Sequence, residues 1–327
     1  MKSDLTKHTL LQTVVLFFAL ASVFLFSGTI MPRHTVTLTG YTPLMVSIVT
    51  FVDTIPWLAM GLSLLLITVN AFFLTRITVR FLSFSDKNYT ASLIYLILCA
   101  VTSSLTGGFV VQSIVFLTLV SIETIFMFNK RDDIVRQMFL SSAYIGITSI
   151  LFIPSAVVFT AMITHLIIYR TINLKGLLAA LTGLALPLFL YCYVTWVAGG
   201  AFTAPLECIR TIFDEIFLRR SLNIFEMTVL QYIFIALVVG ISIYGFIRMA
   251  MSVNHANTLT VRSYVYFVCL LAVLALTLAL AYNTLDTLLP MIAVPLSVII
   301  SMLFRQAPNL YVKNAIALAF LVLALML

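Results

Sequence analysis

The sequence has little charge, because only 9% of its 327 residues are Asp, Glu, Lys or Arg, whereas 62% are hydrophobic. Soluble domains carry about a quarter charged residues, so this composition excludes an ordinary soluble protein. Apolar runs of about twenty residues recur along the chain, which is typical of membrane-spanning α-helices. Stretches such as Leu177–Leu190 do not alternate apolar and polar residues, so the strands of an outer-membrane barrel are excluded as well.

Cysteines and catalytic signatures are also scarce. The chain has four cysteines, none of them in a CxxC pair, so their spacing indicates neither a disulfide framework nor a zinc site. The sequence contains no GxSxG elbow, no HExxH pair, no Walker loop and no dinucleotide-binding glycine fingerprint. Three of the four histidines fall at cytoplasmic levels of the expected topology and one falls outside, so a four-histidine metal centre would need them to cross the bilayer. The sequence therefore predicts no metal site and indicates no particular cofactor.

The net charge of +7 lies on scattered residues, not in a basic run with interleaved aromatic residues. Nucleic acid is therefore not an expected partner. In a membrane protein, a basic excess follows from the retention of Lys and Arg on the cytoplasmic side. The partners that the composition favours are membrane lipid and a lipid-borne substrate, for example a polyprenyl-linked one.

The apolar runs predict an all-α fold: one polytopic transmembrane helical bundle over residues 1–327, with about eleven spans, in the range 10 to 12. Four of the spans are short, and whether those at 90–105 and 313–327 cross fully is left open. The expected limits are 10–31, 55–74, 90–105, 109–128, 137–153, 155–169, 177–198, 228–247, 263–282, 287–304 and 313–327.

The basic residues predict the orientation of these spans. With the N-terminus in the cytoplasm, every inside segment is basic, and the only outside Lys or Arg residues are Arg33, Arg210, Arg219 and Arg220. Both tryptophans, Trp57 and Trp196, then fall near outer ends of spans, where aromatic residues form a belt. We expect a multi-pass protein of the bacterial inner membrane.

The long outer loop, 199–227, contains an amphipathic pattern. Ile209, Ile212, Phe213, Ile216 and Phe217 share one helical face, and charged residues lie mostly on the other. This pattern predicts a helix in the outer membrane interface. Such a helix either seals the rim of the bundle or lines the approach of a lipid-borne substrate.

Ionisable residues inside membrane spans are rare and are candidates for function. Glu123, His165 and Asn70 fall in the inner half of three spans, and Arg170 and Lys175 lie in a tight cytoplasmic turn. Together they form a candidate binding site for an anion or a coupled proton. Alternatively, the buried groups fix helix packing and the two basic residues anchor the turn at the interface.

A second candidate site lies on the outer side. Asp53 precedes the second span, and Asp286 lies in a short outer turn. A carboxylate at the membrane surface can act as a general base or hold a divalent cation against a diphosphate, so both are candidate catalytic residues. Solvated surface acids would give the same pattern.

Residues 139–190 resemble an uncharacterised family of bacterial polytopic membrane proteins, known as a domain of unknown function. The matching features are the break at Leu151-Phe152-Ile153-Pro154, the pair Tyr169-Arg170 followed by Ile172-Asn173-Leu174-Lys175, and Gly183 with Pro187. The resemblance implies a multi-pass fold and draws attention to Arg170. It implies no reaction.

Three functions are open at this point. The first is the handling of a lipid-linked or glycan substrate in cell-envelope assembly. The many spans, the amphipathic external helix and Asp53 on the first outer loop resemble the C-type glycosyltransferases. This resemblance favours the first function and implies that such an acid acts as base or metal ligand. The second is a secondary transporter or permease that uses Asn70, Glu123, His165 and Arg170. The third is a non-catalytic membrane subunit of an envelope complex.

Overall fold

The computed structural model describes residues 40–82, 89–101, 108–127, 134–169, 173–218, 238–247, 258–281 and 284–306. Within these ranges the regular elements are helices. In addition, Tyr41 and Phe152 form a single isolated β-bridge. The expected spans 10–31 and 313–327 lie outside the described residues, as does the first half of 228–247. The prediction of an all-helical chain is thus confirmed for the part that the structure describes.

The helices follow the apolar runs of the sequence. In the described residues they are α2 (Pro43–Asp53), α3 (Pro56–Phe81), α4 (Thr90–Val101), α5 (Gly108–Phe126), α6 (Ile134–Leu151), the short 3₁₀ helix η2 (Ile153–Ala156), α7 (Val157–Ile168), α8 (Leu174–Val197), α9 (Ala204–Leu218), α11 (Thr258–Leu280) and α12 (Leu285–Gln306).

Five of the described helices, α3, α5, α6, α8 and α11, are long and apolar enough to cross a membrane. Length and composition therefore indicate a membrane protein. Shorter apolar helices accompany them, at 43–52, 90–99, 153–168, 238–247 and 287–302. The expected number of about eleven spans stays a prediction.

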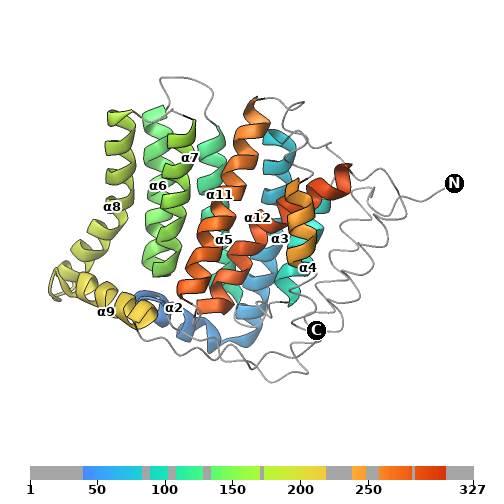
Figure 1. Ribbon diagram of the computed structural model, residues 1–327. Coiled ribbons are helices and arrows are strands. Elements are labelled where there is room, and N and C mark those ends of the chain that lie inside the picture. The colour runs from blue at the N-terminus through green and yellow to red at the C-terminus, as the bar shows by residue number, and fades with distance from the viewer. Residues whose placement is uncertain are drawn as a thin grey trace.

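The long helices lie side by side as a bundle, with α8 at one edge and α6 next to it (Figure 1). Glycines allow α6 and α8 to approach closely. A Cβ atom on Gly146 would lie 2.7 Å from the carbonyl oxygen of Leu184, and one on Gly183 would overlap the carbonyl oxygen of Phe139. Small residues play this role in membrane helix pairs because they bring the backbones into contact. The same segment carries Pro187, inside α8 and buried against Gly146.

Local signals explain where several helices begin. Pro56 begins α3. The N–H groups of the first helical turn have no partner within the helix, so the missing N–H of proline costs no hydrogen bond there. The Oδ1 atom of Asn173 accepts a hydrogen bond of 2.6 Å from the N–H of Gly176 and caps α8. This cap begins α8 directly after residues 170–172, the segment in which the polar residues predict a turn and which lies outside the described residues.

The bundle has two chemically different ends. At one end, which we call the arginine end, α3 and α5 finish and α6, α8 and α11 begin; its described basic residues include Arg76, Arg80, Arg136, Lys175 and Arg262. The other end, which we call the tryptophan end, carries Trp57 and Trp196, which are 75% and 57% exposed. Both α2 and α9 lie across this end (Figure 1). That the arginine end faces the cytoplasm stays a prediction.

Candidate functional site

Glu123 lies at the arginine end, near the end of α5, and is buried. Its Oε1 atom is 3.0 Å from Nε of Arg76 and 3.5 Å from Nη1 of Arg80. The two arginines are four residues apart on α3, so they project from the same face of that helix. One carboxylate from α5 thereby holds two guanidinium groups from α3.

The two arginines reach from this buried acid toward the surface. Their side chains are 56% and 51% exposed, and the Glu123 side chain is 6% exposed. The guanidinium of Arg76 lies 5.7 Å from the centre of the Phe73 ring, and that of Arg80 lies 5.3 Å from the Phe81 ring. Contacts of cations with aromatic faces are favourable, so each guanidinium is held by both a charge and a ring.

His165 lies at the same end, on α7, and it is also buried. Its ring centroid is 5.0 Å from that of Tyr169 and 5.3 Å, edge to face, from that of Tyr266 on α11. The Nδ1 atom of His165 and the hydroxyl of Tyr266 are buried and have no hydrogen-bond partner among the described residues. Arg262 covers the other aromatic residue, with its guanidinium 5.1 Å from the Tyr169 ring.

Aromatic contacts connect the part of the arginine end around Glu123 with the part around His165. The ring of Phe126, one helical turn after Glu123, contacts Phe81 at 5.4 Å and Tyr266 at 5.3 Å. The rings of Phe126 and Tyr266 therefore connect α5, the helix that carries Glu123, with His165.

Asn70 forms a separate polar group deeper in the bundle. Its Nδ2 atom donates hydrogen bonds of 2.9 Å to the carbonyl oxygen and to Oε1 of Gln112, and the hydroxyl of Tyr95 donates to the same Oε1 at 2.8 Å. All three side chains are buried. Asn70 precedes Arg76 by six residues, about 9 Å along α3. Its polar contacts thus join α3, α4 and α5 and do not include Glu123.

The turn between α7 and α8 contains the other two candidate binding residues. Lys175 is exposed in the first turn of α8, at the arginine end. Arg170 lies outside the described residues. The structure therefore brings Glu123, His165 and Lys175 to one end of the bundle, and places Asn70 at another depth.

The two candidate catalytic acids belong to the tryptophan end. Asp53 is the last residue of α2, and Asp286 is the second residue of α12; the side chains of both lie outside what the structure describes. A hydrogen bond of 2.7 Å between the hydroxyls of Tyr41 and Thr287 joins the starts of these two helices. Asp53 lies at the other end of α2 from this hydrogen bond, because it follows Pro43 by ten residues, about 15 Å along the helix.

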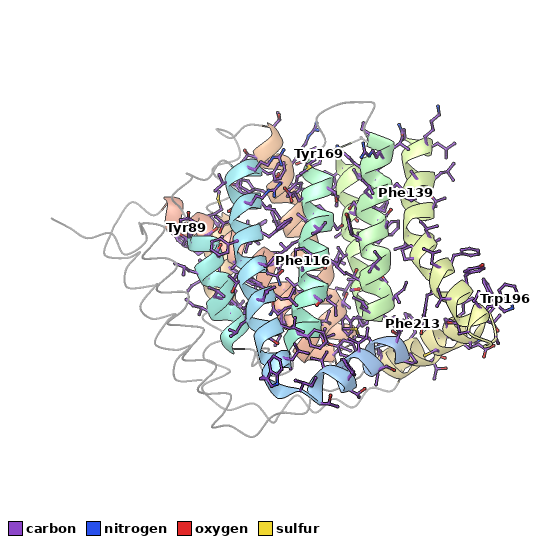
Figure 2. The ribbon with its side chains drawn as sticks, turned by 180° about the vertical axis from the view of Figure 1, so that it is seen from behind. Tyr89, Phe116, Phe139, Tyr169, Trp196 and Phe213 are labelled. Atoms are coloured by element: carbon purple, nitrogen blue, oxygen red, sulfur yellow. The ribbon has the colours of Figure 1, made fainter. Side chains whose placement is uncertain are left out.

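Two helices at the tryptophan end expose apolar side chains. On α2, Met45, Val49 and Val52 are buried, and the exposed apolar residues are Leu44, Ile48 and Phe51. This helix was not foreseen, because its apolar segment is too short for a span. Figure 2 shows Trp196 and Phe213 at this end and Tyr169 at the opposite one.

The amphipathic helix predicted in the outer loop is present as α9. Ile216 is buried, and its Cδ1 would lie 3.3 Å from a Cβ on Gly40, so this side of α9 faces the bundle. Glu207, Arg210 and Asp214 are exposed. Phe213, assigned to the apolar face, is itself exposed. The location of α9 in a membrane interface stays a prediction.

Sequence reasoning missed the partners of the buried polar groups. In the sequence, Arg76 and Arg80 are only two of the basic residues of an expected inner segment, and no pattern draws attention to Gln112 or Tyr95. The spacing of four between the arginines was a visible signal of a shared helix face. Which acid they would meet depends on the packing of α3 against α5.

Among the described residues, no three His, Cys, Asp or Glu side chains are placed to hold a metal ion together. None of the four cysteines, which all belong to described helices, forms a disulfide. The chain matches no protein-family model, no curated protein and no solved structure.

Proposed function

We propose that this chain is an integral protein of the bacterial inner membrane that handles a lipid-borne substrate, lipid-linked or glycan, in cell-envelope assembly. The observation that carries the proposal is the arrangement of the tryptophan end. Two helices, α2 and α9, lie across it, exposed apolar side chains cover parts of both, and α2 ends at Asp53.

The physical reason is the shape of the substrate class. A polyprenyl-linked or glycolipid substrate keeps its chain in the hydrocarbon and its polar head in the interface. Transverse helices with exposed apolar residues, such as Phe51 and Phe213, lie in that interface, because their apolar area is buried in lipid and their polar area in water. A substrate that moves in the leaflet would then meet the end of the bundle at the level of Trp57 and Trp196.

In this proposal Asp53 and Asp286 supply the reactive carboxylates. Each would act as a general base on an attacking hydroxyl, or hold a divalent cation against a diphosphate leaving group. The resemblance to C-type glycosyltransferases supports Asp53 for this part, because it implies that an acid of the first outer loop acts as base or metal ligand.

The test uses purified protein in proteoliposomes with a polyprenyl-diphosphate-linked sugar, with and without Mg²⁺, and mass spectrometry of the lipid products. We expect Asp53→Asn to abolish product, and Asp286→Asn to reduce it. Asp214→Asn on α9 is the matched control, because it is exposed at the same end. Full product formation by Asp53→Asn would refute the assignment of that residue.

Transport is the alternative that a specific observation favours. Glu123 and His165 are buried ionisable residues, and α12 contains Pro290 and Pro295 in a largely buried helix. Secondary transporters combine such groups with broken helices. Substrate-dependent proton flux into liposomes that is lost in Glu123→Gln would support transport. Co-purification of a stoichiometric partner, without either activity, would support the non-catalytic subunit instead.

A further inference from the structure

The two arginines held by Glu123 have more hydrogen-bond donors than one carboxylate can accept. Two guanidinium groups present about ten N–H donors, whereas one carboxylate accepts about four hydrogen bonds. The buried Oε1 of Glu123 lies close to both arginines and yet has no aligned hydrogen-bond donor among the described residues. The carboxylate therefore holds the guanidiniums by charge, and it can accept fewer than half of their N–H groups.

The charges are also unequal. Within the described contacts, two positive groups share one negative group, which leaves one positive charge in excess. Both side chains are about half exposed, so this charge is accessible from outside the bundle. Guanidinium groups prefer planar bidentate contacts with carboxylate or phosphate oxygens.

The length of α3 sets the level of this charge in a membrane. Arg76 follows Trp57 by 19 residues and Arg80 follows it by 23, which are rises of about 28 Å and about 34 Å. The hydrocarbon core of a bilayer is about 30 Å thick. If Trp57 lies at one interface, the two arginines lie at the opposite one, at the depth of the lipid phosphates.

We infer that Arg76 and Arg80, positioned by Glu123, form a binding site for the phosphate of an anionic membrane lipid in the leaflet at the arginine end. The phosphate accepts the N–H groups that Glu123 leaves available and offsets the excess charge. Phe73 and Phe81 restrict the guanidiniums from one side. This site lies at the opposite end from the proposed substrate approach and does not depend on it.

Ordinary interfacial anchoring by long basic side chains makes a different forecast. Anchoring needs only charge, so it tolerates Lys in place of Arg and does not select among anionic lipids by geometry. A site built from two oriented guanidiniums needs their planar donors, and Lys cannot supply these.

The experiment is native mass spectrometry of the full chain released from nanodiscs that contain equal amounts of phosphatidylglycerol and phosphatidylethanolamine. The wild type is expected to retain phosphatidylglycerol preferentially. Both Arg76→Gln/Arg80→Gln and Arg76→Lys/Arg80→Lys are expected to reduce this preference at least tenfold. Arg136→Gln, which removes an exposed arginine at the same end, is expected to keep it. Unchanged preference in the double Lys variant would overturn the inference in favour of simple anchoring.

A second measurement uses the wild type alone, in case a variant does not fold. Its unfolding temperature in lipid-free detergent is expected to rise on addition of phosphatidylglycerol and to change much less with inorganic phosphate or phosphatidylethanolamine. An equal rise with inorganic phosphate would overturn the assignment to a lipid. No rise with any of the three would overturn the site itself.

Discussion

The contact between α6 and α8 supports a quantitative prediction. Gly146→Ala would add a Cβ atom 2.7 Å from the carbonyl oxygen of Leu184 and 3.0 Å from Cγ of Pro187. An ordinary contact of a Cβ begins at 3.4 Å, and a backbone oxygen cannot rotate away. The two helices must therefore separate locally by roughly 0.7 Å, and overpacking of this kind lowers the free energy of unfolding by about 1–3 kcal/mol.

Gly61→Ala is the matched control, because Gly61 lies inside α3 and a Cβ there would meet nothing within 4 Å. Replacing this glycine should leave stability unchanged or raise it slightly, since Ala favours helix more than Gly does. Both variants are compared with the wild type by thiol-reactive dye unfolding in detergent, which reports exposure of the buried Cys99 and Cys192. Equal unfolding temperatures for Gly146→Ala and Gly61→Ala would refute the close approach of α6 and α8.

Three further substitutions test other contacts. Glu123→Gln should lower the free energy of unfolding by only about 1 kcal/mol, because the two arginines that Glu123 contacts are half exposed and therefore screened by solvent. Denaturant titration measures this loss, and a loss above roughly 3 kcal/mol would contradict the prediction. Asn70→Leu should cost about 1–3 kcal/mol by the same titration, since it removes two hydrogen bonds of 2.9 Å and leaves buried acceptors of Gln112 without that donor. Ile216→Ala should lower the free energy of unfolding by about 2 kcal/mol and speed proteolysis within α9, because it removes the buried side chain that α9 places against Gly40. An unchanged digestion rate would show that this contact does not hold α9.

Hydropathy alone located most helices that the structure describes, because an apolar run of span length has few other stable forms in lipid. Ends were harder to predict. The second span was expected to stop at residue 74, but α3 continues to Phe81 through Arg76 and Arg80. Arginine is a good helix former, and its long side chain leaves the helix toward the interface without breaking it.

Contacts between distant helices could not be predicted from periodicity. Glu123 was a candidate for one polar site with Arg170, His165 and Asn70. Its described charge partners are Arg76 and Arg80, and Arg170 lies outside the described residues. Nothing in the sequence says which faces of α3 and α5 meet, and that choice determines every polar partner in the bundle. Helix α2 was missed for a different reason, because eleven residues are too few for a span and a transverse helix needs no such length.

The central claim is that the arginine end and the tryptophan end lie on opposite sides of a membrane, with the arginine end in the cytoplasm. The most direct test is labelling of single cysteines, introduced into a cysteine-free variant, with a membrane-impermeant maleimide on right-side-out and inverted vesicles. Lys175→Cys and Arg136→Cys are expected to react only in inverted vesicles, and Thr203→Cys, at the start of α9, only in right-side-out ones. Reaction of Lys175→Cys and Thr203→Cys from the same side would contradict the claim, because α8 would then not cross the bilayer.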